Sequence, residues 1–418
     1  MRIDPTTHHV QLNPRDPAFY NNPYPYYDQL RAEAPIFYWE EFGFWCFVAH
    51  EDVNALLRDR RFGRQITHLA TREELGWPPV RAELRPFYDV DDHSMLELEP
   101  PDHTRLRGLV QKAFMARQIE RLRPRIAAQS HQLIDAMQDK MRSGGRANLL
   151  TDFATPIPVT VIAELIGIPT EMNEALLNWS HAMVGMYELA RAPEQEQRAV
   201  QAAQEFVAYL RDVVAERRRH PQDDLLSQLI AVEEGGEKLS EAELIATCIL
   251  LLNAGHEATV NVVGNGVYAL LQQRDQLERW QNDAALTPSA VEELLRFDTP
   301  LHLFNRWVLE DITYKGQYFP FGTQVALLLG AANRDPAVFE TPNRLDLSRP
   351  HNPHLSFGGG IHYCLGAPLA RLELQVALPI LLQRLSHMEL VQEPRYRNTY
   401  HFHGLDALWV GSRHGLVG

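Results

Sequence analysis

The longest hydrophobic pattern in the chain predicts a helix. In SEAELIATCILLLNAGHEATVN, which begins at Ser240, apolar residues recur at helical spacing and fill the first half of the segment. Ser240 and Glu243 form a capping-box pair, so we expect the helix to begin near Glu241 and to run to about Gln273. At 1.5 Å per residue such a helix is on the order of 50 Å long, which is enough to cross a domain.

Polar residues interrupt this apolar pattern near its middle. They are Asn253, His256, Glu257, Thr259 and Asn261. A buried carboxylate costs several kcal/mol unless it is paired or hydrogen-bonded. Glu257 therefore indicates a helix that emerges into solvent, a structural ion pair, or a functional site, and the residues alone leave these three interpretations open.

The remaining pattern predicts a mostly α domain with minor β structure. Alternating aromatic and apolar residues between Ile36 and His50 predict a small sheet. Helical periodicity dominates from about Asp102 to Gln273 and continues to about Phe297. Short strands, a further long apolar helix and a tail of strands and turns follow. Because no low-complexity linker or internal repeat divides residues 1–418, we expect a single domain.

Composition excludes several classes of protein. The chain has 418 residues, of which 45% are hydrophobic and 22% charged, as in ordinary globular proteins. Its net charge of −14 argues against general nucleic-acid binding. The N-terminus lacks the apolar core of a signal or anchor, and the most apolar run, Cys248 to Leu252, is far shorter than a membrane span. Three widely spaced cysteines, Cys46, Cys248 and Cys364, argue against a disulfide framework. We therefore expect a cytoplasmic protein with no membrane partner.

One basic segment runs against this acidic balance. Between His103 and Arg125, seven basic side chains accompany a single acid, Glu120. They are Arg105, Arg107, Lys112, Arg117, Arg121, Arg123 and Arg125. The segment is either a solvated helix face or a docking surface for an acidic partner.

The residues around Cys364 carry the most specific signal. In FGGGIHYCLG, from Phe357 to Gly366, three glycines precede the cysteine, and glycine lets a backbone adopt positive φ and approach a flat ligand closely. A helix with Pro368 in its first turn follows, so Cys364 lies near a helix N-terminus, where the thiolate is favoured. A thiolate suits a soft metal. The chain contains neither CxxC nor CxxCH, which argues against structural zinc and c-type haem.

This segment resembles the haem-ligand loop of the cytochromes P450, F-G-x-G-x-x-x-C-x-G, with every fixed position filled. Glu293 to Arg296 resembles the family's E-x-x-R, and Ala254 to Thr259 its oxygen-binding helix segment. PPDHTRLR, which ends at Arg107, resembles the segment before helix C in soluble bacterial members. The resemblance runs from about Pro14 to Leu405. It implies the cytochrome P450 fold, mostly α with minor β, with a long central helix over the haem and small N-terminal and C-terminal sheets.

The resemblance also implies a cofactor, haem b (iron protoporphyrin IX), with the Cys364 thiolate as its metal ligand. The residues implied at the two haem propionates, which need cations or donors when buried, are His103, Arg107, Arg306 and His362. The residues implied around the rest of the haem are Ala254, Gly255, Phe357 and Gly366, the first two leaving room for O2. Glu293, Arg296 and a later arginine, Arg349, are implied to form a buried structural triad.

The implied reaction is monooxygenation of a largely apolar small molecule, by hydroxylation or epoxidation. One atom of O2 enters the substrate and the other leaves as water. The sequence contains no second Gly-rich βαβ unit and no iron–sulfur cysteine set, so we expect no fused reductase domain. Electrons are then expected from a separate ferredoxin and ferredoxin reductase, which favours the docking interpretation of the basic segment.

The central helix departs from the family at one position. The family places an acid and then a threonine there; Glu257 fits the acid, but Ala258 follows it. Thr259 is one residue further, about 100° around the helix. Three explanations remain: a water or a substrate hydroxyl completes the proton relay, which we favour; Thr259 reaches the site through local unwinding; or the chemistry is peroxide-driven or non-redox. A haem sensor or carrier is a further alternative to an enzyme.

The walls of the substrate pocket are implied by resemblance alone. The segments implied are residues 77–98, 183–187, 301–304 and 400–402, together with Leu251 and Asn253. They are rich in apolar and aromatic side chains, which favours an apolar ligand. His302 and Asn305 add polar contacts to this ligand or are satisfied loop residues.

Overall fold

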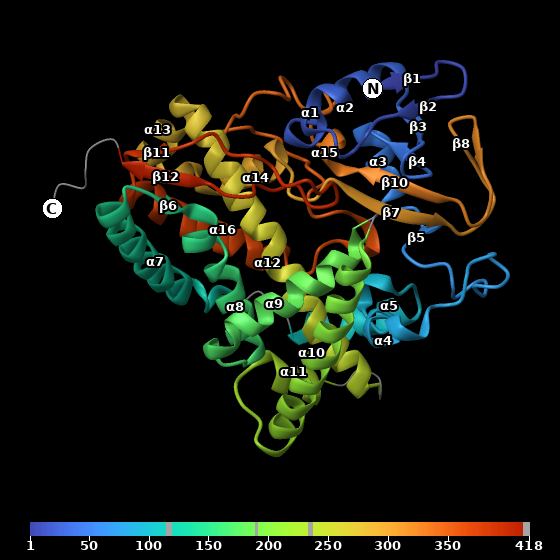
Figure 1. Ribbon diagram of the computed structural model, residues 1–418, viewed down its shortest axis with the longest axis horizontal. Helices are drawn as coiled ribbons and strands as arrows, with labels where there is room; N and C mark the ends of the chain where they lie inside the picture. Colours follow the sequence, from blue (N-terminus) through green and yellow to red (C-terminus); the bar gives the residue numbers. More distant parts are fainter. Residues whose placement is uncertain (114–118, 189–190, 233–236, 413–418) are drawn as a thin grey trace.

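A computed structural model describes residues 1–113, 119–188, 191–232 and 237–412. Its central feature is helix α12 (Glu241–Gln272), which passes through the middle of the molecule (Figure 1). The predicted capping box is present: the Ser240 hydroxyl accepts from the Glu243 N–H at 3.3 Å, and the Glu243 carboxylate accepts from the Ser240 N–H at 2.8 Å. None of the helices in the described part of the chain is both long and apolar enough to cross a bilayer.

Helices surround α12 on several sides. The longer ones are α5 (Asp102–Ala113), α7 (Arg123–Gly144), α8 (Pro156–Ile166), α9 (Asn173–Val184), α10 (Pro193–Arg219), α14 (Thr287–Phe297) and α16 (Ala367–Arg384). The shorter ones are α1 (Pro17–Asn21), α2 (Tyr24–Glu33), α3 (His50–Leu56), α4 (Arg85–Asp91), α11 (Leu225–Ala231), α13 (Arg274–Asn282) and α15 (Leu329–Ala332). One apolar core joins most of them, and Ile134, Val161, Leu210, Val267 and Leu378 in it are completely buried. Full burial of such a side chain contributes roughly 1.5–3 kcal/mol.

The strands form two main sheets and a hairpin. A seven-stranded sheet has the order β1-β2-β3-β4-β10-β7-β5, a three-stranded sheet the order β11-β12-β6, and β8 pairs with β9. Their bounds are β1 (Arg2–Ile3), β2 (His9–Gln11), β3 (Ile36–Trp39), β4 (Phe44–Phe47), β5 (Phe62–Gly63), β6 (Ala147–Asn148), β7 (Leu303–Val308), β8 (Ile312–Tyr314), β9 (Gln317–Phe319), β10 (Gln324–Leu328), β11 (Met388–Leu390) and β12 (Trp409–Ser412). The two sheets lie at opposite sides of the helical body (Figure 1).

Each sheet combines distant parts of the chain. The predicted N-terminal sheet is present as the antiparallel pair β3–β4, but β10 adds parallel to β4 and β7 adds antiparallel to β10. This pairing sets Val325 opposite Arg306 and so fixes the backbone position of that arginine. The C-terminal sheet likewise includes β6, which directly follows α7. The two sheets are therefore not confined to the ends of the chain.

The predicted buried triad is formed at the end of α14. Glu293 and Arg296 are both fully buried and pair at 2.7 Å, and Arg349 approaches Glu293 at 3.1 Å. The same carboxylate accepts from Asn352 at 3.1 Å and from the Asp346 N–H at 2.9 Å. Its charge is thus compensated by two guanidinium groups and further donors.

Replacing one member of this cluster should destabilise the protein strongly. We expect Glu293→Gln to lower the free energy of unfolding by about 3–5 kcal/mol, because it leaves two guanidinium groups without a buried anion. Urea unfolding followed by circular dichroism measures this loss. The matched control is Glu216→Gln, whose carboxylate pairs with Arg219 in an exposed i,i+3 pair and should change stability by about 0.5 kcal/mol or less. Equal effects of the two substitutions would contradict the assignment.

Candidate active site

Cys364 lies in the loop that leads into α16. Its N–H donates to the Phe357 carbonyl at 2.9 Å, which closes the loop, and Gly366 is the N-cap of the helix. Pro368 stands in the first turn, as predicted. Burial raises the pKa of the Cys364 thiol, while the N–H groups of Gly366 and Ala367 act in the opposite direction. A coordinated metal would keep this thiol deprotonated.

Packing within the chain restricts the glycines of the loop, most strictly Gly360. Gly358 and Gly360 have φ values of 70° and 67°. A Cβ on Gly360 would lie 2.3 Å from the carbonyl oxygen of Leu57, and one on Gly359 would lie 2.7 Å from Nη1 of Arg58. Close approach to the end of α3 is therefore a reason for these glycines that the sequence did not indicate.

The four residues predicted at the propionates are brought near the cysteine loop. The rings of His103 and His362 are 4.3 Å apart, and Nη2 of Arg107 donates to the carbonyl of Tyr363 at 2.7 Å. Arg306 is 2% exposed, and its burial lowers its pKa to about 9.

Two of these residues have no direct anionic partner among the described residues. Nε2 of His103 is buried without a hydrogen-bond partner. Arg306 donates to the Asn305 carbonyl at 2.9 Å and has no carboxylate within ion-pair distance among the described residues. Unmatched buried donors are costly, and an anionic group with two carboxylates, such as haem, fits them. The assignment of these four residues to the propionates stays a prediction.

Three small residues of α12 are more exposed than their neighbours. Ala254 is exposed, and Gly255 and Ala258 are half-buried, whereas His256 and Glu257 between them are buried. These three residues therefore border accessible space. A Cβ on Gly255 would lie 3.5 Å from Ile162, so α8 bounds that space on one side. The predicted room for O2 beside Ala254 and Gly255 stays a prediction.

Glu257 is a buried, ionised carboxylate. It is 6% exposed, and Arg397 pairs with its Oε1 at 2.7 Å. Its Oε2 lies 3.5 Å from Nε2 of His181 and 3.6 Å from Nε2 of His256. Desolvation raises the pKa of Glu257, but the hydrogen bond from His181 and the charge of Arg397 outweigh it and bring the pKa to about 2. The helix thus does not emerge into solvent at this carboxylate, and an ion pair is present.

Thr259 does not replace the missing threonine in this conformation. Helix α12 continues without a break past Ala258, and the Thr259 hydroxyl donates to the Gly255 carbonyl at 3.4 Å. Its hydroxyl is therefore engaged within the helix. The explanation by local unwinding finds no support in the structure.

Several residues beside the site were missed by sequence reasoning. Glu99 lies 3.4 Å from His362 and accepts from the N–H of Arg64 at 2.5 Å. Arg371 stacks over Phe357 at 4.5 Å and pairs with Glu292 at 2.7 Å. Arg371 lies early in α16, seven residues after Cys364, so the sequence places it close to the loop. Nothing local points to the others.

The polar residues of the predicted pocket walls are partly engaged elsewhere. His302 is fully buried, and its Nδ1 shares a 2.7 Å hydrogen bond with the hydroxyl of Tyr27. Tyr187 donates to Asp91 at 3.0 Å, which links the end of α9 to α4. Nε2 of His302 is buried without a hydrogen-bond partner, so the alternatives for His302 both remain predictions.

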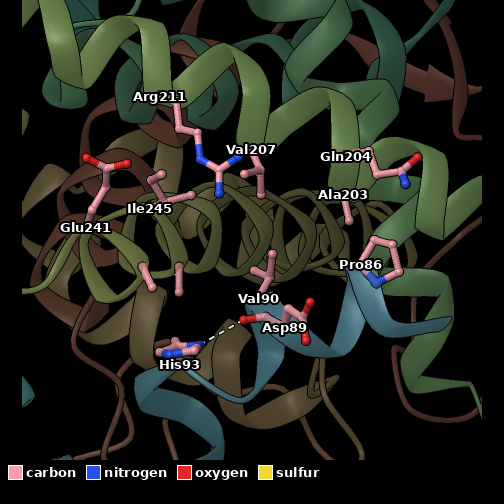
Figure 2. Close-up of a pocket in the computed structure, with 12 residues that line it drawn as sticks. Pro86, Asp89, Val90, His93, Ala203, Gln204, Val207, Arg211, Glu241 and Ile245 are labelled. Carbon is pink, nitrogen blue, oxygen red and sulfur yellow. Dashed lines mark hydrogen bonds between the residues drawn. The ribbon is translucent and has the colours of Figure 1, made fainter. Parts of the chain in front are cut away.

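A separate pocket of about 840 Å³ opens between α4, α10 and the first turns of α12. Figure 2 shows Val90, Val207 and Ile245 on its walls, with Asp89 and Arg211 among the polar residues around it. On α12 it ends at Ala246, eight residues before Ala254, or about 12 Å along the helix. This pocket is therefore not the space beside Cys364 and Glu257.

The basic segment carries less free charge than its sequence indicates. Arg105 pairs with Glu243, Arg123 with Glu120, and Arg125 with Glu164. Residues 114–118, which include Arg117, lie outside the described residues. These pairs reduce the positive surface available to an acidic partner.

The lowered pKa of Glu257 predicts a specific acid sensitivity. A carboxyl whose folded pKa is depressed stabilises the fold above its unfolded pKa of about 4.3, and this stabilisation is lost as the pH falls toward the folded value of about 2. Between about pH 6 and about pH 3.5 the wild type should therefore lose about 1 kcal/mol more unfolding free energy than Glu257→Gln. Urea titrations at several pH values measure this difference, and parallel curves for the two proteins would exclude it.

Comparison with known proteins agrees with this geometry. The family model for cytochrome P450 matches residues 80–403. The polyketide biosynthesis cytochrome P450 PksS of Bacillus subtilis (strain 168) is 39% identical over 96% of this chain and 98% of its own length. The mycinamicin IV hydroxylase/epoxidase of Micromonospora griseorubida is 41% identical over 87% of this chain and 88% of its own.

A solved structure supports the same relationship. P450BioI, in complex with hexadec-9Z-enoic acid ligated acyl carrier protein, superimposes with a TM-score of 0.87 at 37% identity, over 95% of this chain and 99% of that one. The sequence match spans most of the chain and the fold agrees over the same range. The chain belongs to the cytochrome P450 family and is a haem-thiolate monooxygenase.

Proposed function

We propose that this monooxygenase hydroxylates or epoxidises a largely apolar molecule derived from a polyketide or fatty acyl chain, and that the substrate itself carries a hydroxyl group. The observation that carries the proposal is the buried carboxylate of Glu257 beside the half-buried methyl group of Ala258. A relay carboxylate without a neighbouring threonine needs an external hydroxyl or a water to complete it.

The proposed cofactor is haem b, held within a single haem domain. Cys364 would ligate its iron, and His103, Arg107, Arg306 and His362 would hold its propionates. The unmatched Nε2 of His103 and the unpaired guanidinium of Arg306 support this assignment. When bound, the haem supplies the activation of O2 and the transfer of one oxygen atom to the substrate.

Glu257 moves protons in this proposal. Because its pKa is about 2, Glu257 is ionised and only weakly basic at neutral pH, so in this proposal it holds a proton only transiently as it passes it on. His181 is half exposed and 3.5 Å from Oε2, so it offers a path from solvent. Arg397 holds Oε1 and keeps the carboxylate oriented. Ala258 adds no polar group but leaves space for the hydroxyl that receives the proton.

The substrate class is inferred from the relatives. One is named for polyketide biosynthesis, another acts on mycinamicin IV, and a third was solved with an acyl chain on its carrier protein. The names point to substrates of polyketide or fatty acyl origin. The apolar side chains of the implied walls, such as Met183 and Leu251, suit a largely apolar substrate.

The proposed electron donors are a ferredoxin and a ferredoxin reductase in the cytoplasm. Arg107 lies on the Cys364 side of the site, where electrons would arrive. It acts on the pKa of the Cys364 thiol, as does Arg371, whose charge is already paired with Glu292. An acidic ferredoxin would find cations there, and its binding would weaken with salt. Because Arg105, Arg123 and Arg125 pair with acidic residues of the same chain, few cations remain for a ferredoxin-binding surface.

Reconstituted turnover tests the proposal. Haem-loaded protein, ferredoxin, ferredoxin reductase and NADPH should convert hydroxylated macrolide or long-chain acyl substrates to products that carry one additional oxygen atom from O2, measured by mass spectrometry with labelled O2. Substrate binding should shift the Soret band. Turnover with hydrogen peroxide alone, and none with the reductase system, would overturn the proposal in favour of peroxide-driven chemistry.

Restoring the threonine tests the role of Ala258. We expect Ala258→Thr to leave the fraction of NADPH coupled to product unchanged within about twofold for a hydroxylated substrate, because the hydroxyl is already supplied. With the deoxy analogue of that substrate, the same substitution should raise coupling. Thr259→Ala is the matched control and should change neither value. A large rise with the hydroxylated substrate would contradict substrate assistance.

A further inference from the structure

The side chains around Glu257 form a cluster that proton transfer alone does not explain. His181 on α9, together with His256 and Glu257 on α12, present one ligand atom each, and all three atoms lie within 4.8 Å of one another. Oε2 of Glu257 lies 3.5 Å from Nε2 of His181 and 3.6 Å from Nε2 of His256. In a tetrahedral zinc site with bonds of 2.0–2.1 Å, ligand atoms are about 3.4 Å apart. Both distances from Oε2 of Glu257 are close to that spacing.

The histidine on α12 is already in the form that binds a metal. Nδ1 of His256 lies 3.0 Å from the carbonyl oxygen of Leu252, which can only accept, so Nδ1 carries the proton. Burial lowers the pKa of His256, which favours the neutral ring with its lone pair on Nε2. That Nε2 is buried and has no hydrogen-bond partner. A ligating histidine whose other nitrogen donates to a backbone carbonyl is the arrangement found in zinc sites.

The remaining two ligands complete an accessible site. Arg397 binds Oε1 of Glu257 and leaves Oε2 to face the histidines, so the carboxylate would bind a metal through one oxygen. The side chain of His181 is 50% exposed, which provides an entry path. Two imidazoles and one carboxylate with an open fourth position is the ligand set of many catalytic zinc ions.

A second cluster of similar composition lacks these properties. Asp298, His302 and His403 also lie within reach of one ion, but all three are buried. The Asp298 carboxylate already accepts from Tyr24 at 2.6 Å and from Tyr396 at 2.5 Å. Each of its oxygens is therefore occupied by a protein donor, and the described structure opens no path to it.

We propose that His181, His256 and Glu257 form a binding site for a divalent transition metal of the zinc type, which ties α9 to α12. If Glu257 also relays protons, as proposed above, metal occupancy withdraws that carboxylate and inhibits turnover. Arg397 opposes the incoming charge, so the site favours reversible binding over permanent occupancy. Because Glu257 is both a metal ligand and a proton relay in these proposals, zinc binding would inhibit oxygenation.

Zinc binding to the haem-loaded resting enzyme tests the site. Isothermal titration with zinc chloride should show a single site that weakens by at least about tenfold in His181→Ala, because even the loss of an outer partner costs that much. His387→Ala, an exposed histidine elsewhere, is the matched control and should leave the affinity unchanged. X-ray absorption should give two nitrogen ligands and one oxygen ligand at about 2.0–2.1 Å. Because His181 is half exposed, its variant should retain the wild-type spectrum of the reduced, CO-bound protein.

The outcomes separate this inference from the proposed function. Equal zinc affinity in the wild type and His181→Ala, or binding abolished by His387→Ala, overturns the metal site. Zinc that lowers turnover of the wild type by a larger fraction than turnover of His181→Ala, each measured against its own zinc-free rate, supports both the site and the relay. Zinc that binds at a single site without changing turnover supports the site and removes Glu257 from proton delivery.

Discussion

The buried ion cluster at the end of α14 holds the segment that leads to Cys364. That segment, residues 333–366, contains little regular secondary structure, so its backbone needs partners outside helices and sheets. Arg296 supplies several, donating to the carbonyls of Asn333 and Pro342 at 2.9 Å each. Glu293 holds Arg349 and Asn352 further along. The position of the cysteine loop thus depends on two charges that are stable only together.

The two sides of the site differ in charge: buried polar groups near the cysteine loop lack an anionic partner, whereas α12 holds a buried anion. Near the cysteine loop, Nε2 of His103 is buried without a hydrogen-bond partner and Arg306 has no carboxylate within ion-pair distance among the described residues, a state that a bound dianionic group relieves. On α12, Glu257 is a buried anion that Arg397 and His181 compensate. The first arrangement is suited to receiving a charged cofactor, and the second to holding a carboxylate ready without one.

The absence of a hydroxyl at Ala258 matters because Ala258 follows Glu257 on α12. Ala258 lies on the half-buried face of α12, beside accessible space, and contributes no polar atom there. Polar chemistry on this helix is therefore concentrated on the buried side, where His256 and Glu257 meet His181. A group that enters from outside, whether substrate hydroxyl, water or metal ion, changes the function of that carboxylate.

Local patterns alone determined the long helices, the capping box at Ser240 and the motif around Cys364, because helical periodicity, capping and glycine runs depend on residues a few positions apart. They also placed Glu257 in the middle of the long apolar helix and indicated that, if buried, it needed a partner. Only the tertiary structure decided which partner. Arg397 and His181 come from a C-terminal loop and from α9, and β10 sets the place of Arg306 through strand pairing. No local pattern encodes such contacts, because they arise when the apolar core brings elements far apart in the chain together.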